Sequence, residues 1–331
     1  MRPVFSVALA LTLLVPLASS AQGIPTVGNT EPFTLSVDPQ YPVPFSEVFL
    51  SANSSSLDLT NATMTVTVAG AQLYRGSVQP TKIKLGRAGS ITRVTVTMTI
   101  NGVPTVQSVS IQPQDVALVA EPVASAPPLY PGKPLVPLEG DTRIVAVANF
   151  RTSGGAALDP AALSYAWTVD DTKIANSSGI GKSAVLVASP LQYRARTVAV
   201  AITSQDGALV GGDSISLSPQ SPSVRVYEND PLLGIRFDRA LVGAYAVAGA
   251  ESTLYAAPFS VPLKSGAPLI QWFLNGSPAQ TGGSITLRPS GSGQGSASLS
   301  LTASSGNQIH TAANNLLLTF GAAASTNFFG L

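Results

Sequence analysis

The feature of this sequence that most constrains its fold is a pattern of two alternating β runs joined by a polar turn, which occurs three times. The copies span residues 94–113, 198–219 and 297–320, so that Val198 follows Val94 by 104 residues and Ala297 follows Val198 by 99 residues. A period of this length matches one β-sandwich domain and exceeds the roughly 20 to 50 residues of a solenoid repeat. The chain is therefore predicted to be all-β, with three related sandwich modules in a row.

The first 21 residues have the composition of a secretory signal peptide. Arg2 supplies a positive charge, an apolar run covers residues 7–17, and the small residues Ser19 and Ala21 lie where a signal peptidase reads them. A retained membrane anchor is the alternative, but the run is shorter than the roughly 20 apolar residues of a spanning helix. We therefore expect residues 1–21 to be cleaved and the remainder to be exported to the periplasm, the cell surface or the medium.

The composition excludes several classes of partner and linkage. The chain has 18 Lys and Arg, 17 Asp and Glu, and no cysteine. The lack of cysteine excludes disulfides and lipid attachment through cysteine, and modules of about a hundred residues fold without such staples. Without Arg2 the charges balance, so nucleic-acid binding, which needs clustered Lys and Arg, is not expected. No later apolar segment is long enough for a stable membrane span, and an exported cysteine-free β chain is typical of bacteria.

Alternating residues and prolines divide the chain into modules. In residues 62–68, Thr alternates with Met and Val, which places the apolar set on a core face. The proline-rich residues 127–137 cannot donate ladder hydrogen bonds and belong to an edge or a crossing between sheets. Short linkers containing proline restrict bending, so three modules would form a rod on the order of 100 Å long. The predicted modules are residues 32–113, 116–219 and 222–321, followed by a tail at 322–331.

Two tryptophans are predicted to anchor two of the cores. Trp167 and Trp272 each lie in the middle of a predicted strand that precedes a polar turn. A tryptophan on a central strand is a common core anchor of immunoglobulin-like sandwiches, so neither is expected to bind a ligand. The first module has Val66 near this place and is expected to be less stable.

These residues resemble tandem immunoglobulin-like modules of exported bacterial surface proteins, and among them the PKD-like kind. The second module resembles them best, through Tyr165-Ala-Trp-Thr-Val-Asp-Asp171 and Thr197-Val-Ala-Val-Ala-Ile-Thr203. The third module matches more loosely, and the first matches only in its strand pattern. The resemblance implies a fold but almost nothing about function, because such sandwiches carry many unrelated roles.

No constellation of residues predicts a catalytic, cofactor or metal site. His310 is the only histidine, and without partners for a zinc site or a triad it is expected to be a surface residue. Glu228 and Asp230 lie near a module boundary, where they could hold calcium together with Asp238 or Asp206. Calcium needs about six to eight oxygen ligands, so a solvated turn is the simpler interpretation.

We therefore expect an exported, non-enzymatic structural or binding protein of the cell envelope or surface, which mediates adhesion or spacing. Its partner would be an envelope or surface protein, or a glycan. One alternative is carbohydrate binding, in which Tyr41, Tyr130, Tyr245 and Tyr255 would stack on sugars. The other is an accessory subunit of a pilus or secretion apparatus.

Overall fold

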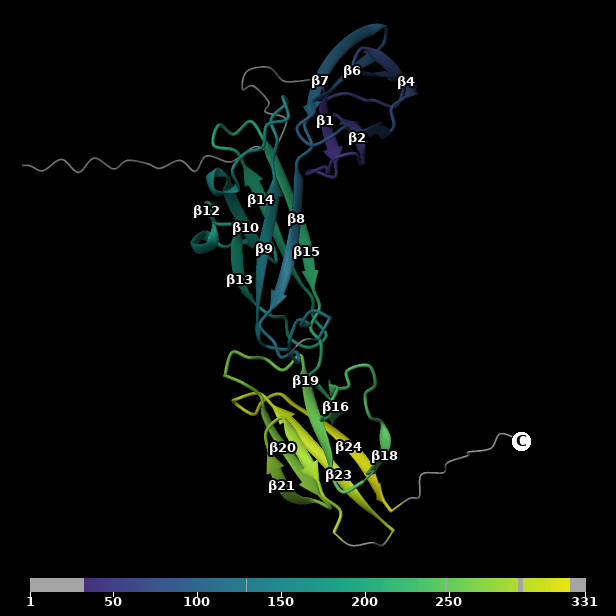
Figure 1. Cartoon of the computed structure of the whole chain (residues 1–331). Coiled ribbons are helices and arrows are strands. Elements are labelled where there is room, and N and C mark those ends of the chain that lie inside the picture. The colour runs from purple at the N-terminus through teal and green to yellow at the C-terminus, as the bar shows by residue number, and fades with distance from the viewer. Residues whose placement is uncertain (1–32, 129, 248, 291–293, 322–331) are drawn as a thin grey trace, which may run out of the picture. The chain divides into compact units, whose positions relative to one another are not determined.

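The computed structural model describes residues 33–128, 130–247, 249–290 and 294–321 (Figure 1). The predicted signal peptide at residues 1–21 and the predicted tail at 322–331 lie outside these ranges. Within them, the elements are strands apart from two short 3-10 helices, Pro160–Ala162 and Ala175–Ser177. None of the described helices is long and apolar enough to cross a membrane. The chain forms two compact units, one reaching Gln114 and including Thr152–Gly155, the other comprising Asp115–Arg151 and the chain from Ala156 onward.

The first sandwich consists of two antiparallel sheets. One sheet has the order β1, β2, β5, formed by Thr34–Asp38, Glu47–Asn53 and Thr81–Lys84. The other has the order β4, β3, β6, β7, formed by Ala71–Ser77, Thr63–Val68, Thr92–Ile100 and Val103–Ile111. Met64 and Val66 point into the core between the sheets, as the alternation along this segment predicts.

The second sandwich repeats this arrangement. One sheet has the order β13, β9, β8, formed by Ala184–Ala188, Asp141–Asn149 and Asp115–Pro122. The other has the order β11, β10, β14, β15, formed by Thr172–Lys173, Ser164–Val169, Arg196–Thr203 and Val210–Leu217. A short strand β12, Gly179–Ile180, also pairs with β10.

The third sandwich has larger sheets. One has the order β17, β16, β19, β22, formed by Gly234–Ile235, Ser223–Asp230, Ser252–Phe259 and Ser284–Leu287. The other has the order β18, β24, β23, β20, β21, formed by Gly243–Val247, Thr311–Phe320, Gly295–Ser304, Leu269–Leu274 and Ser277–Thr281. Strand β18 runs parallel to β24, whereas the other pairings in the third sandwich are antiparallel.

The strand order is the same in all three sandwiches once the extra edge strands of the third are set aside. Hairpins β6–β7, β14–β15 and β23–β24 are the three repeated runs of the sequence, and each contributes two adjacent strands to the larger sheet. Two packed antiparallel sheets of this kind are an immunoglobulin-like sandwich. The predicted all-β fold with three tandem immunoglobulin-like modules is therefore confirmed, while the limits at 32–113, 116–219 and 222–321 stay predictions.

Both tryptophans are core residues, as predicted. Trp167 on β10 and Trp272 on β20 are fully buried. The indole Nε1 of Trp167 donates to the carbonyl oxygen of Lys182, and that of Trp272 to the carbonyl oxygen of Gly282, each at 2.9 Å. The polar edge of each ring is thus satisfied inside the core. In the first sandwich, Val66 takes the corresponding place and is fully buried.

The same tight turn follows the corresponding strand of each sandwich. Its two central residues have positive φ angles in Ala69–Gly70, Asp170–Asp171 and Asn275–Gly276. This is the geometry of a type I′ hairpin turn, which favours Asn, Asp and Gly. The carboxylate of Asp170 accepts a hydrogen bond from the backbone N–H of Thr197, and the amide oxygen of Asn275 accepts one from that of Ser298, each at 2.9 Å. Ala69 has no side chain that could form this bond.

Candidate functional site

The acidic residues considered for calcium binding each have a local role. Asp230 Oδ1 accepts from the backbone N–H groups of Leu233 at 2.9 Å and Leu232 at 2.8 Å, and these hydrogen bonds lower the pKa of its carboxyl group. Asp238 pairs with the guanidinium of Arg236 at 3.1 Å. The carboxylate therefore fixes a turn in one case and neutralises a neighbouring cation in the other.

The other two residues considered for calcium binding, Glu228 and Asp206, also accept hydrogen bonds from neighbouring residues. Glu228 accepts a hydrogen bond from the hydroxyl of Tyr245 at 3.2 Å. Asp206 accepts bonds from the Ser204 hydroxyl at 2.5 Å and the Ala208 backbone at 3.1 Å, which lower the pKa of its carboxyl group. In the part of the chain that the structure describes, no three His, Cys, Asp or Glu residues are grouped so that they could hold a metal ion. Among the described residues, the structure thus does not group the acidic residues that were considered as possible calcium ligands.

His310 corrects one expectation, because its side chain is largely covered. The side chain of His310 is 13% exposed, and its Nε2 lies 3.4 Å from the carboxylate of Glu139 in the second sandwich. The expectation of a surface residue is therefore wrong. A contact between residues so far apart in sequence depends on how the two sandwiches pack, which no local pattern reveals.

Three of the four tyrosines considered for sugar stacking, Tyr130, Tyr245 and Tyr255, lie in the second unit and do not share one face. Tyr130 packs edge-on against Phe259, with ring centroids 5.1 Å apart. Tyr245 and Tyr255 lie on opposite sheets of the third sandwich, on β18 and β19. Tyr41, Tyr245 and Tyr255 are half-buried, and this burial raises the pKa of their phenols. Within the second unit, Tyr130, Tyr245 and Tyr255 therefore do not form a planar row of exposed rings.

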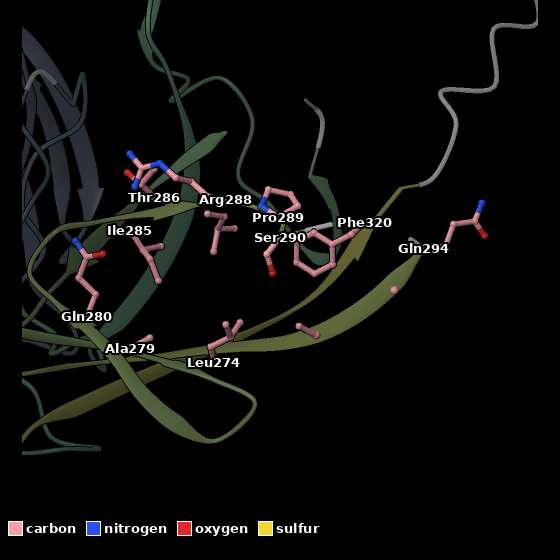
Figure 2. A pocket seen from close by; sticks show the side chains of 13 residues that line it. Leu274, Ala279, Gln280, Ile285, Thr286, Arg288, Pro289, Ser290, Gln294 and Phe320 are labelled. Atoms are coloured by element: carbon pink, nitrogen blue, oxygen red, sulfur yellow. The ribbon is translucent and has the colours of Figure 1, made fainter. Parts of the chain in front are cut away.

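The third sandwich contains an open cavity of about 610 Å³ between its two sheets. Figure 2 shows Leu274, Ile285 and Phe320 around a common space, with the side chain of Arg288 directed away from it. The lining combines apolar side chains with polar ones, among them Gln280, Thr286 and Gln294, and its volume is in the range of small-molecule pockets. We call this space, lined chiefly by Leu274, Ile285, Leu287, Ala297 and Phe320, the intersheet cavity.

The intersheet cavity is open because both sheets end beside it. Strand β22 is the last strand of one sheet and β21 is the last strand of the other, so no further described strand closes the sandwich on this side. Arg288 directly follows β22 and pairs with Glu251 at 2.8 Å on the outer face of the sheet that ends in β22, where its side chain stays 68% exposed.

A protruding turn on the same sandwich exposes two leucines. Leu232 is 92% exposed and Leu233 is 70% exposed, at the tip of the hairpin that joins β16 to β17. We call residues 230–234 the leucine hairpin. Sequence reasoning took this segment for an acidic turn and missed the leucines, although two leucines between the turn formers Asp230, Pro231 and Gly234 were a visible signal.

The base of the leucine hairpin is held in place by aromatic packing. The ring of Phe237 lies edge-on to Tyr227 at 5.2 Å and to Tyr255 at 6.2 Å, measured between centroids. The backbone N–H of Arg236 donates to the carbonyl oxygen of Glu228 at 2.9 Å. The leucines are thus presented by an ordered turn with satisfied backbone groups.

The second and third sandwiches are joined by main-chain pairing inside the second unit. Ala124 forms an antiparallel bridge with Pro262. The backbone N–H of Ser125 donates to the carbonyl oxygen of Val261 at 2.9 Å, and that of Ser260 donates to the carbonyl oxygen of Ser125 at 3.1 Å. The hydroxyl of Ser125 also accepts from the backbone N–H of Val261 at 3.1 Å. Ser125, Ser260 and Val261 are all buried.

An ion pair supports this junction. Lys264 Nζ lies 3.1 Å from the carboxylate of Asp141, whose side chain is only 18% exposed. The carbonyl oxygen of Asp141 in turn accepts from the backbone N–H of Val123 at 2.8 Å. The loop after β19 is therefore bonded to the chain after β8 by ladder-like hydrogen bonds rather than by side chains alone.

Comparisons with known proteins give only distant structural likenesses. No protein-family model matches the chain, and no curated protein matches it. Among solved structures, the central fibronectin-III array of RIM-binding protein is 8% identical, with a TM-score of 0.29, over 86% of this chain and 95% of that one. The three N-terminal domains of the bacteriophage RB49 outer capsid protein Hoc are 14% identical, with a TM-score of 0.24, over 88% of this chain and 99% of that one.

The fibronectin(III)-like modules of Clostridium thermocellum CbhA are 12% identical to this chain, with a TM-score of 0.24, over 62% of this chain and 95% of that one. TM-scores of this size support no inference about this protein. The fold assignment rests on the strand order, and any function has to be argued from the surfaces described above.

Proposed function

We propose that this chain is an exported, non-enzymatic structural or binding protein of the cell envelope or surface, in which three immunoglobulin-like sandwiches serve spacing or adhesion. The observation that carries the proposal is the main-chain pairing of Ser125 with Ser260 and Val261. Backbone hydrogen bonds between two sandwiches resist bending at the junction, because each bond fixes both partners in direction as well as in distance. A spacer needs this property, whereas a chain of freely hinged binding modules does not.

The stiffness of the junction can be measured directly. Because the chain has no cysteine, two engineered cysteines are unique labelling sites. Val147→Cys on β9 and Leu317→Cys on β24 are both exposed and lie in the second and third sandwiches. We expect the distance between spin labels at these two sites to have one narrow distribution in electron–electron resonance.

A matched pair of variants tests the role of Ser125. Ser125→Pro removes the backbone donor to Val261 and should broaden the distribution, whereas Ser125→Ala removes only the hydroxyl and should leave it narrow. Unchanged fluorescence of Trp167 and Trp272 would show that both sandwiches stay folded. A distribution that is equally broad before and after Ser125→Pro would contradict the spacer role.

Export is tested separately, by fractionating cells that make the full chain. We expect the protein in the envelope or the medium, shortened by about the length of a signal peptide. Recovery of the uncleaved chain from the cytoplasm would refute the proposal. Isolation with envelope glycan as the sole companion would favour the carbohydrate-binding alternative.

A further inference from the structure

We propose that the contact between His310 and Glu139 makes the stiffness of the junction between the second and third sandwiches depend on pH. The junction is held most firmly while the imidazole carries a proton and the carboxylate does not. The inference rests on the spacing role proposed above, because only a stiff junction can be loosened in this way. We call the pair of His310 and Glu139 the histidine contact.

The histidine contact joins the two sandwiches at a place that the main-chain pairing does not use. Val261, which takes part in that pairing, follows β19 in the smaller sheet of the third sandwich. His310 directly precedes β24, which belongs to the opposite sheet. A single line of backbone hydrogen bonds still permits rotation about the line itself, as at a hinge. A contact made from the opposite sheet restricts this rotation.

The imidazole is carried by an ordered loop. The backbone N–H of His310 donates to the hydroxyl of Ser305 at 3.1 Å, and its carbonyl oxygen accepts from the backbone N–H of Ser305 at 2.8 Å. Gly306 lies so close to the carbonyl oxygen of Ser265 that no Cβ would fit between them. The loop at residues 305–310 therefore packs on the loop that follows the main-chain pairing, which fixes the ring relative to the third sandwich.

The carboxylate is presented by an equally ordered turn. Glu139 has a φ of 51°, and the next residue, Gly140, is buried. A Cβ at Gly140 would lie 3.3 Å from the Cβ of Pro262 in the third sandwich, and the carbonyl oxygen of Gly140 accepts from the backbone N–H of Ser189 at 2.8 Å. The turn is thus bonded to the second sandwich while it packs against the third.

The neighbouring charges leave the carboxylate of Glu139 to His310. The loop at residues 305–310 has no other charged residue, and Lys264 on the adjacent loop pairs with Asp141 at 3.1 Å. Arg225 lies on the opposite sheet, where its guanidinium covers the ring of Phe259. Among the described residues, Glu139 forms an ion pair only with His310, so its charge is neutralised across the junction only when the imidazole is protonated.

The direction of the pH effect follows from these charges. Imidazoles ordinarily gain a proton between about pH 8 and pH 5, and glutamate carboxyl groups do so near pH 4.3. The attraction between imidazolium and carboxylate exists only while the two sandwiches are in contact, so the bound proton and the closed junction stabilise each other. The junction should therefore tighten as the pH falls through the histidine range and loosen again where the carboxylate is protonated.

The spin-label pair Val147→Cys and Leu317→Cys measures this effect. We expect the distance distribution to be narrower at about pH 5.5 than at about pH 8, and both to be narrower than that of Ser125→Pro at the same pH. Glu139 is 51% exposed, so water screens the pair. The ratio of open to closed junctions should rise about twofold to fivefold between the two pH values, which is typical of a half-exposed ion pair.

Matched variants assign the pH response to the histidine contact. Glu139→Gln and His310→Gln should each abolish the response, because neither variant can form the ion pair. Glu251→Gln is the control, since its side chain is also 51% exposed but precedes β19 at the other end of the third sandwich. It should respond as the wild type does. Unchanged fluorescence of Trp167 and Trp272 in each variant shows that both sandwiches remain folded.

The single histidine gives a second measurement. Because the chain has no other imidazole, the NMR signals of His310 are unique, and they should shift over the same pH range in which the distance distribution broadens. A wild-type distribution that is equally narrow at both pH values would overturn the pH dependence and leave the spacing role standing. A pH response that persists in Glu139→Gln would also overturn it. A distribution that is equally broad at both pH values, with or without Ser125→Pro, would overturn both proposals.

Discussion

The turn after β3 carries an alanine where the other two sandwiches carry Asp170 and Asn275, and replacing it should stabilise the first sandwich. Ala69 has a φ of 50°, a left-handed conformation that costs most L-residues roughly 1–2 kcal/mol. Asparagine tolerates this conformation better than alanine. Its amide oxygen would also accept from the backbone N–H of Arg93, since Ala69 N donates to Arg93 O as Asn275 N donates to Ser298 O.

The size of the expected stabilisation follows from the added hydrogen bond and from the relief of backbone strain at residue 69. A net hydrogen bond is worth about 0.5–1.5 kcal/mol, and relief of the left-handed strain contributes a fraction of its full cost. We therefore expect Ala69→Asn to raise the free energy of unfolding of the first sandwich by about 1–2 kcal/mol. The mirror change, Asn275→Ala, should lower that of the third sandwich by a similar amount.

Native-state hydrogen exchange, detected by mass spectrometry, measures the stability of each sandwich separately. Peptides from β3 and β6 report on the first sandwich, and peptides from β20 and β23 report on the third. Ala69→Gly relieves the φ strain without adding the hydrogen bond, and it also raises the conformational entropy of the unfolded chain. It should therefore raise the free energy of unfolding less than Ala69→Asn does. The reasoning would be refuted if Ala69→Asn left protection in β3 and β6 unchanged while Asn275→Ala lowered it in β20 and β23.

Two further predictions concern the third sandwich. A Cβ at Gly306 would lie 2.0 Å from the carbonyl oxygen of Ser265, so Gly306→Ala should cost about 1–3 kcal/mol in urea unfolding, while Gly295→Ala, with open space around it, should change little. Hydrogen bonds from the backbone, first from Leu233, lower the pKa of Asp230 below its ordinary value of 3.8. The carboxylate therefore stabilises the leucine hairpin above that ordinary pKa, and this contribution is lost as the pH falls through the lower folded-state pKa, which an NMR titration of Asp230 and of the Leu233 amide would show.

Much of the fold could be predicted because strand alternation is a local signal. In β3, Thr63 is exposed and Met64 is buried, and the alternation of polar and apolar residues in the sequence predicts this difference. The two tryptophans could be placed because so large a side chain on a central strand needs an enclosed site. The first strand begins at Thr34, whereas the apolar Phe33 before it is buried without being part of the ladder. Apolar character reports burial and does not by itself report strand pairing.

The exposed surfaces could not be predicted in the same way, because the exposure of a residue depends on which distant segments of the chain pack over it. The turn at residues 230–234 was visible from its Asp, Pro and Gly, but the exposure of Leu232 depends on the absence of a covering strand. The contact of His310 with Glu139 depends on how two sandwiches meet. Glu228 and Asp230 were expected in a solvated turn, but both belong to β16, whose last residue is Asp230. Only the structure shows that the Asp230 carboxylate accepts hydrogen bonds from the backbone of the turn that follows.

The parallel pairing of β18 with β24 decides how the third sandwich yields under tension. Five residue pairs join the two strands, from Gly243 with Leu316 to Val247 with Phe320. Once β16 and β17 have been pulled from their partners, tension on the chain draws β18 toward its beginning and β24 toward its end, so the two strands slide against each other along their length. All the rungs between them then carry the load together, whereas a hairpin pulled from its open end parts one rung at a time. The third sandwich should therefore hold until a high force is reached and then give way abruptly.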